Sequence, residues 1–306
     1  MLLAGPTASG KSALALDLAA HFDGVVINAD AMQVYREMSV LTARPDAAAE
    51  AGAPHRLYGF LPVTEGFSAG RWRERAVAEI RAAEDAGKLP IVVGGTGLYL
   101  KALSGGLSPM PPVPDGIRAR VRARVEEIGS EAFHAELAAR DPVMAGRLRV
   151  SDRQRIARAM EVWEATGTSL ADWQGRGAVE EGFGFLTLLL APPREVLHAA
   201  CDARFRAMVA NGALAEARAM RALVLDPALP ATRALGLREL IRHLDGEVGL
   251  EEAIGLAQAA TRQYAKRQMT WFRNQLSDPT IFNEQYSERV RQESFSKIEH
   301  WRLTSA

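Results

Sequence analysis

The chain has 306 residues, of which 48% are hydrophobic and 24% are charged, and its formal net charge at pH 7 is +0. This apolar content is enough to bury a core, so disorder over most of the chain is excluded, and the zero net charge argues against a protein that coats nucleic acid through bulk charge. The longest apolar stretch, Phe185 to Ala191, is far shorter than the roughly 20 residues of a membrane span, and a single cysteine, Cys201, excludes an internal disulfide. We expect a cytoplasmic protein without a signal peptide that does not bind membranes.

The first part of the chain alternates between short apolar runs and helical patterns. The expected elements are a strand over 1–4, a helix over 11–21, a strand over 25–27, a helix over about 69–86 and a strand over 89–93. Ser68 is the expected cap of the second helix. Strands rich in Val and Ile that alternate with helices predict an α/β fold, a parallel sheet flanked by helices.

A second domain is predicted as an insertion in the first. Prolines and glycines over 105–116 interrupt the alternation, and residues 117–173 are almost purely helical in pattern, with a break at Asp141-Pro142. Residues 186–190 form a strand that we expect to return to the first sheet. The predicted domains are a core of residues 1–112 plus 185–306 and an all-helical insertion of residues 113–184.

The remainder of the chain is expected to be mainly helical. Long helices are predicted near 195–225 and 250–273, because apolar residues recur there at helical spacing. Residues 277–306 show no strong period, and we expect them to form a loosely packed tail.

A phosphate-binding motif follows the first predicted strand. Residues 5–12 fit the pattern G-x-x-x-x-G-K-[ST], and they are Gly5, Pro6, Thr7, Ala8, Ser9, Gly10, Lys11 and Ser12. Glycines let backbone amides turn inward around phosphate oxygens, and the positive end of the following helix dipole faces the same anion. Lys11 can reach a terminal phosphate, and the Ser12 hydroxyl can hold Mg²⁺. The motif predicts phosphate binding without naming the reaction, and it makes the expected α/β fold a P-loop NTPase-like parallel sheet flanked by helices, with the P-loop in the core of residues 1–112 plus 185–306.

One acidic residue, Asp30, lies at the end of a predicted strand. An ordinary P-loop NTPase needs such an acid to help hold Mg²⁺, whereas the strand over 91–93 ends in Gly94-Gly95-Thr96-Gly97 without a carboxylate. Asp30 would lie near the phosphate loop at the carboxyl edge of the sheet. It is compatible with a helix N-cap, with a ligand of Mg²⁺-bound water, or with a general base that acts on an acceptor nucleophile.

Arginine supplies 32 of the 37 basic residues. A GC-rich genome favours arginine over lysine everywhere, and this bias explains a single arginine about as well as a function does. Clusters are less easily explained in this way. The predicted insertion carries Arg118, Arg120, Arg122 and Arg124, and then Arg147, Arg149, Arg153, Arg155 and Arg158.

Five motifs can be read in order along the chain. They are Gly-Pro-Thr-Ala-Ser-Gly-Lys-Ser at 5–12, Asn-Ala-Asp-Ala-Met-Gln-Val-Tyr at 28–35, Thr-Ala-Arg-Pro at 42–45, Gly-Gly-Thr-Gly-Leu-Tyr at 94–99 and Gln-Arg-Ile-Ala-Arg at 154–158. Together they resemble the bacterial tRNA dimethylallyltransferases of the IPP transferase family, also called tRNA isopentenyltransferases. The resemblance covers most of the chain, from Gly5 to Arg273. Ala31, Leu41, Arg44, residues 55–59 and Leu237 depart from the family's usual residues, but none of them removes a group with an assigned chemical role.

The resemblance implies a prenyltransferase that moves a dimethylallyl group from its diphosphate to N6 of adenosine 37 in tRNA. The phosphate loop would hold the diphosphate instead of ATP, although loops of this type are commonly described as ATP-binding. Mg²⁺ would be the cofactor, with Ser12 as its ligand, and the enzyme would work as a monomer on the anticodon stem-loop of tRNA. The catalytic residues would be Asp30 as general base, Lys11, Thr96 and Arg118.

Contacts to tRNA are implied for residues of both predicted domains. They are Asp30, Ala31, Met32, Gln33, Thr96, Arg118, Gln154, Arg155, Ile156, Ala157 and Arg158. The target base would have to leave the anticodon-loop stack to reach the pocket. Residues 233–238 and 266–273 are weaker candidates for contact with RNA or diphosphate, and Trp271 and Phe272 are expected to be core aromatics.

Two other reactions are compatible with the phosphate loop. An adenylate prenyltransferase that uses free AMP or ADP would share the loop and Asp30. A small-molecule kinase would use the arginine-rich insertion as a lid over ATP, but it leaves Thr96 and residues 154–158 without a purpose. A non-catalytic RNA-binding module would not need Lys11 and Asp30 together.

Overall fold

The computed structural model describes residues 1–177 and 182–304 of the chain. The chain divides into two compact units, Met1–Ser104 with Gly182–Ala306, and Gly105–Glu181. We call them the core unit and the inserted unit. Within the described residues, no helix combines the length and the apolar character that a membrane crossing requires.

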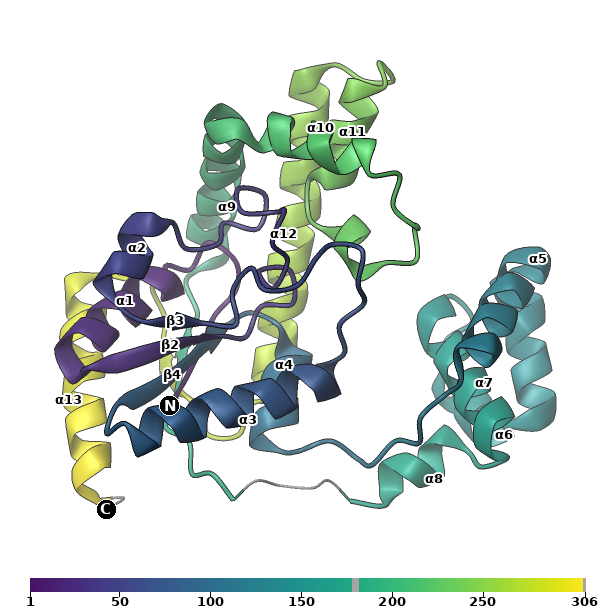
Figure 1. Ribbon diagram of the computed structural model, residues 1–306, viewed down its shortest axis with the longest axis horizontal. Helices are drawn as coiled ribbons and strands as arrows, with labels where there is room; N and C mark the ends of the chain where they lie inside the picture. The colour runs from purple at the N-terminus through teal and green to yellow at the C-terminus, as the bar shows by residue number, and fades with distance from the viewer. Residues whose placement is uncertain (178–181, 305–306) are drawn as a thin grey trace. The chain divides into compact units, whose positions relative to one another are not determined.

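A six-stranded sheet forms the centre of the core unit (Figure 1). Its strands are β1 (Leu2–Ala4), β2 (Gly24–Asn28), β3 (His55–Arg56), β4 (Leu89–Gly94), β5 (Thr187–Leu190) and β6 (Thr280–Phe282), in the spatial order β3-β2-β4-β1-β5-β6. Every neighbouring pair is parallel. The predicted α/β fold with a parallel sheet is confirmed, and β5 returns to this sheet beside β1 as expected.

Helices cover both faces of the sheet (Figure 1). The helices of the core unit are α1 (Lys11–Phe22), α2 (Ala47–Gly52), α3 (Ala69–Asp85), α4 (Gly97–Ser104), α9 (Arg194–Met208), α10 (Leu214–Ala222), α11 (Leu237–Leu244), α12 (Leu250–Gln275) and α13 (Glu288–Thr304), with short turns η1 (Val209–Ala213) and η2 (Pro230–Arg233), and α10 and α11 pack in a cluster away from the strands. Successive strand residues point to opposite faces. Leu2 therefore packs with residues of α3 and α4, whereas Leu3 packs with residues of α1 and α13. Ser68 caps α3, as predicted, by accepting the N–H of Arg71.

The long helix expected over 195–225 is interrupted. A π-helical turn, η1, separates α9 from α10, and within it Gly212 has a φ of 106°, which a continuous helix does not allow. The interruption gives α10 a direction of its own, and its apolar face packs with α11 and the loop over 32–41.

The expectation of a loosely packed tail over 277–306 is wrong. β6 pairs with β5, and α13 packs against α1 with Val290 and Ile298 fully buried. The sequence pattern is weak because β6 has only three residues and most positions of α13 are polar. Packing against the rest of the core unit supplies the order that local pattern does not indicate.

The inserted unit is all-helical within its described residues. Its helices are α5 (Asp115–Arg140), α6 (Pro142–Arg147), α7 (Arg153–Thr166) and α8 (Leu170–Gly175). Asp141 is buried at the predicted break, where its carboxylate caps α6 through the N–H of Met144 and accepts the hydroxyl of Ser169. Side chains such as Phe133, Leu137 and Met160 give this unit a core of its own.

Candidate active site

The predicted phosphate loop lies between β1 and α1 at the carboxyl edge of the sheet. Gly10 has a φ of 88°, and a Cβ there would come within 2.6 Å of the Cβ of Tyr286, so the position requires glycine. Gly10 also precedes α1 without a side-chain cap, which leaves the first amides of the helix to an anion.

The C-terminal part of the chain braces this loop from outside. The N–H of Tyr286 donates to the carbonyl oxygen of Ser9 at 3.2 Å, and the side-chain amide of Gln285 donates to that of Ala8 at 3.0 Å. The hydroxyl of Tyr286 also contacts the carboxylate of Asp17 on α1. Because the two carbonyl groups are held on the outer side, the conformation of the loop depends on residues that sequence reasoning assigned to a loose tail.

Two side chains of the loop have surroundings that an anion would complete. Ser9 is fully buried, and its hydroxyl has no hydrogen-bond partner among the described residues. Lys11 donates to the carbonyl oxygen of Pro6 at 3.3 Å. Burial, and then the nearby charge of Arg204, lower the pKa of Lys11 to about 8, while Asp30 opposes this shift. A bound anion would supply an acceptor for the hydroxyl and a counter-charge for the cation.

Asp30 follows β2 in a turn that its own carboxylate organises. Its Oδ1 accepts the N–H of Met32 at 2.9 Å, and its N–H donates to Oδ1 of Asn28 at 2.7 Å. Asn28 is fully buried, which anchors this turn to the core. The next helix along the described chain, α2, begins only at Ala47, so the helix N-cap considered for Asp30 is wrong.

Thr96 ties the loop after β4 to the loop that carries Asp30. Its hydroxyl accepts the N–H of Ala31 at 2.9 Å, and its own N–H donates to the carbonyl oxygen of Ala29 at 3.2 Å. A Cβ at Gly94 would lie 2.2 Å from that same carbonyl oxygen, so glycine allows the two strand ends to approach. Tyr264 on α12 hydrogen-bonds to the side chain of Thr96, and burial raises the pKa of its hydroxyl.

These loops open onto one cavity of about 320 Å³. Its polar and charged lining residues are Thr7, Asp30, Thr42, Thr96, Arg204, Arg233, Thr261, Tyr264 and Arg267, and its other lining residues are Ala31, Met32, Leu41, Cys201, Phe205, Met208, Ala234 and Leu235. Cations, one carboxylate and a continuous set of apolar side chains thus face a common space. Such a cavity can hold an anion beside an apolar group.

The structure brings five of the predicted core-unit residues together at this cavity. Thr7, Asp30, Ala31, Met32 and Thr96 all line it. Gln33 does not, because its side-chain amide donates to the carbonyl oxygens at positions 42 and 43, both at 2.9 Å, and so shapes the loop that follows.

Several cavity residues were missed by sequence reasoning. Cys201, Arg204, Phe205 and Met208 stand at positions i, i+3, i+4 and i+7 of α9, a spacing that also marks an ordinary core stripe. A guanidinium nitrogen of Arg204 lies 3.5 Å from Oγ1 of Thr7. Burial lowers the pKa of Arg204, and Asp30 opposes this shift. Arg233 and Arg267, which fell in the weaker candidate ranges, also line the cavity. Phe272 is buried in the core as predicted, and Trp271 packs against that core.

The remaining predicted residues belong to the inserted unit. Arg118 lies in the first turns of α5, 3.4 Å from Asp115. Arg155 on α7 is 75% exposed and pairs with Asp152 at 3.5 Å, and Arg158 pairs with Glu161 at 3.3 Å. In the same stretch Gln154 is exposed, Ala157 is half-buried, and Ile156 is buried in the unit's core.

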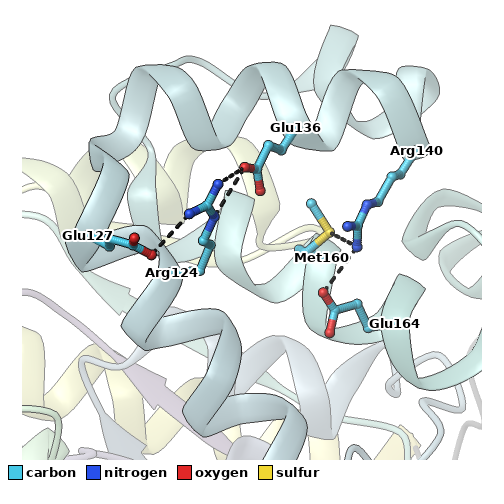
Figure 2. Close-up of polar contacts among 6 residues, drawn as sticks. All are labelled: Arg124, Glu127, Glu136, Arg140, Met160 and Glu164. Carbon is cyan, nitrogen blue, oxygen red and sulfur yellow. Dashed lines mark hydrogen bonds and ion pairs between the residues drawn. The ribbon is translucent and has the colours of Figure 1, made fainter.

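Other arginines of the clusters support the inserted unit itself. Figure 2 shows Arg124 between Glu127 and Glu136, and Arg140 between the sulfur of Met160 and the carboxylate of Glu164. These pairs are mostly exposed, so each contributes little to stability. Arg124 and Arg140 each have two partners, whereas Arg155 and Arg158 of α7 each form one ion pair among the described residues, so the α7 arginines are the better candidates for an external anion.

Comparison with known proteins gives consistent matches. The model of the IPP transferase family matches residues 33–275. A tRNA dimethylallyltransferase from Rhodospirillum centenum is 57% identical over 285 residues, which cover 92% of this chain and 91% of that protein. One from Paramagnetospirillum magneticum is 53% identical over 308 residues, covering 100% of this chain and 97% of that protein.

Solved structures agree with the sequence matches. The tRNA delta(2)-isopentenylpyrophosphate transferase of Staphylococcus epidermidis superposes with a TM-score of 0.69 at 29% identity, over 98% of both chains. A eukaryotic dimethylallyltransferase acting on tRNA superposes with a TM-score of 0.74 at 27% identity, over 89% of this chain and 69% of that one.

Proposed function

The chain belongs to the IPP transferase family, and from that premise we propose that its cavity transfers a dimethylallyl group from dimethylallyl diphosphate to N6 of adenosine 37 in tRNA. The enzyme is a tRNA prenyltransferase, and the cytoplasm is the compartment in which it would meet its substrate. The working unit that we propose is a monomer.

The composition of the cavity wall is the single observation that carries this proposal. Thr7 of the phosphate loop and Asp30 face the same space as the apolar side chains of Leu41, Phe205 and Met208. A five-carbon allylic chain needs such an apolar surface directly beside a diphosphate site.

The phosphate loop and two cations would stabilise the leaving group. Negative charge grows on the diphosphate as the allylic C–O bond breaks, so preorganised donors lower the barrier. The amides at the start of α1, Lys11 and Arg204 are the donors in place, because Arg204 reaches Thr7 and both cations lie in the field of Asp30. The buried hydroxyl of Ser9 would gain the partner that it lacks.

The residues present fit Mg²⁺ as the accompanying cation. Ser12 is exposed at the start of α1, and its hydroxyl is a hard oxygen ligand next to the anion-binding amides. Mg²⁺ keeps several waters and is commonly held by few protein oxygens together with substrate phosphates. When bound, it would add positive charge to the diphosphate.

Asp30 would act as the general base. The exocyclic amine of adenine is a poor nucleophile, because its lone pair is delocalised into the ring. A carboxylate that accepts the N6 proton while the N–C bond forms typically contributes about 10²–10⁴-fold. The bond between Thr96 and Ala31 holds the backbone beside Asp30, and we assign Thr96 and Arg118 to contacts with the base or the phosphate.

The inserted unit would bind the anticodon stem-loop. The base must leave its stack to reach the cavity, and unstacked loop bases are where proteins read RNA sequence. Gln154 and Arg155 on α7 are exposed, and Arg158 is half-buried on the same helix. Their backbone neighbours Ile156 and Ala157 would position them.

The experiment that tests the proposal follows the prenyl group. Label transfer from radiolabelled dimethylallyl diphosphate with Mg²⁺ is measured with three acceptors: undermodified tRNA with adenosine at position 37, the same tRNA with guanosine there, and free AMP. We expect label on the adenosine tRNA alone. Label on AMP alone would identify a nucleotide prenyltransferase, and phosphorylated product with ATP would identify a kinase.

A further inference from the structure

A single side-chain amide connects the two loops of the active site. Gln268 on α12 is 5% exposed, and its Oε1 accepts the N–H of Thr7 at 2.9 Å. Its Nε2 donates to the carbonyl oxygen of Gly95 at 2.8 Å. Both polar atoms of the amide are therefore used, one by the phosphate loop and the other by the loop after β4.

The backbone around this amide is built to admit it. β1 and β4 are neighbours in the sheet, with Ala4 paired to Gly94 in register. The chains that leave these two strand ends lie on either side of the Gln268 side chain. A Cβ at Gly95 would come within 2.2 Å of Nε2 of Gln268, so only glycine leaves room for the amide at this point.

The contacts of Gln268 extend, through the loop after β4, toward Asp30, the proposed general base. Gly95 precedes Thr96, whose hydroxyl accepts the N–H of Ala31, the residue after Asp30. Thr7, whose N–H donates to the other atom of the Gln268 amide, lines the cavity and contacts Arg204. The side chain of Gln268 does not itself line the cavity; besides the two loops, it contacts the hydroxyl of Tyr264, which does line it.

We propose that Gln268 is a positioning residue that sets the separation between the diphosphate site and the loop of Asp30. This inference rests on the proposed prenyl transfer. An isosteric change that breaks one of the two hydrogen bonds would shift the loops relative to each other, and small misplacements of reacting groups have large effects on rate. The amide thus couples donor binding to acceptor chemistry through the backbone.

The test is Gln268→Glu, which keeps the acceptor for Thr7 and replaces the donor to Gly95. Above the pKa of the new carboxyl, a carboxylate oxygen would face a carbonyl oxygen. Below it, the protonated carboxyl donates a hydrogen bond again, and burial raises this pKa. We expect kcat/KM to fall about 10- to 100-fold at pH 8 and to recover toward wild type as the pH falls to 6. Tyr264 contacts this side chain and burial raises its pKa, and the ratio to wild type at each pH isolates the effect of the substitution from the pH dependence that both proteins share.

Two further variants separate positioning from stability. Gln268→Met, of similar length, lacks both hydrogen bonds, and we expect a loss of the same size at every pH. Gln263→Glu is the matched control, because Gln263 is exposed on the same helix, and its kcat and KM should equal those of wild type. If Gln268→Glu does not fold, Gly95→Ala tests the same contact by displacing Nε2.

Affinity for inorganic diphosphate, measured by calorimetry, is a readout independent of transfer. We expect the diphosphate affinity of Gln268→Glu to be weaker than that of wild type at pH 8 and to return toward the wild-type value at pH 6. Wild-type kcat, KM and diphosphate affinity in both Gln268 variants, whatever their melting temperatures, would overturn the inference. If wild-type enzyme transfers no prenyl group, the proposed function fails, and diphosphate affinity alone then decides whether Gln268 orders the phosphate loop.

Discussion

The hydroxyl of Thr96 accepts the backbone N–H of Ala31 at 2.9 Å and so joins the loops after β4 and β2. Thr96→Val removes the acceptor while keeping the shape of the side chain, and it leaves a partly buried N–H without its partner. We expect kcat to fall about tenfold or more. Thr96→Ser retains the hydroxyl and should stay within a few-fold of wild type. Steady-state kinetics of both variants measures kcat. Equal kcat values for Thr96→Val and Thr96→Ser would show that the hydrogen bond from the N–H of Ala31 does not contribute to the rate.

Asp30→Asn separates base chemistry from loop structure. The amide oxygen can still accept the N–H of Met32, so the turn should persist. We expect kcat to fall by about 10²–10⁴-fold, the range of a lost general base, with tRNA affinity within about twofold of wild type. Single-turnover prenylation and filter binding measure the two quantities. Unchanged turnover would remove Asp30 as the base.

The lowered pKa of Lys11 predicts that diphosphate binding depends on pH. Burial and Arg204 lower its pKa to about 8, so the unliganded site loses this positive charge as the pH rises through about 8. The protonated form binds the anion. We therefore expect the Kd for inorganic diphosphate to rise above pH 8, by up to about tenfold per pH unit.

The control for this prediction is Lys11→Met. Diphosphate itself titrates, and the ratio of the variant's Kd to that of wild type cancels this contribution. The ratio should be largest below pH 8 and approach one at higher pH. A constant ratio from pH 6.5 to 9.5 would show that Lys11 does not titrate in this range.

The sheet and the phosphate loop could be predicted because their signals are local. Buried strands such as Leu89–Gly94 read as continuous apolar runs, and Gly10 occurs where only glycine can take the required φ. β3 and β6 could not be predicted, since two or three residues carry no period. Their strand character comes from pairing with β2 and β5.

The cavity residues on α9 could not be predicted, for a different reason. Arg204 contacts Thr7 across 197 positions of sequence, and nothing near Arg204 distinguishes it from other arginines of the chain. Likewise, Gln285 and Tyr286 brace the phosphate loop through backbone carbonyl groups, a contact that leaves no residue pattern. Motifs identified the residues that surround the anion, whereas long-range packing determined what holds them.

We predict that Glu216 stabilises both the folded protein and the loop that carries the cavity residue Leu41. Its carboxylate accepts the backbone N–H groups of Ser39, Val40 and Leu41 at 2.6, 3.0 and 2.7 Å. Leu41 lines the cavity. Glu216→Ala leaves three amides without their acceptor, and we expect the free energy of unfolding to fall by about 2 kcal/mol, with a raised KM for the prenyl donor. Urea midpoints measure the first effect. Glu252→Ala, an exposed change on α12, should shift stability by less than about 0.5 kcal/mol.

The arginines of α7 predict the salt dependence of tRNA binding. Arg155 is 75% exposed, and both Arg155 and Arg158 have only single carboxylate partners within α7 and its cap. Exposed pairs of this kind are weak enough for a phosphate to replace them. If each arginine neutralises one phosphate, Arg155→Ala with Arg158→Ala should reduce the slope of log K against log salt by between about 1 and 2.

The matched control changes the same charge elsewhere. Arg289 and Arg291 lie on α13 and also pair with nearby glutamates, so their double alanine variant has an identical net charge. Bulk charge would weaken tRNA binding equally in both variants, whereas direct phosphate contacts would affect only the α7 variant. Unchanged affinity and slope in the α7 variant would show that tRNA does not contact these arginines, and the RNA-binding surface would then have to be sought among the other arginines of the inserted unit, beginning with Arg118.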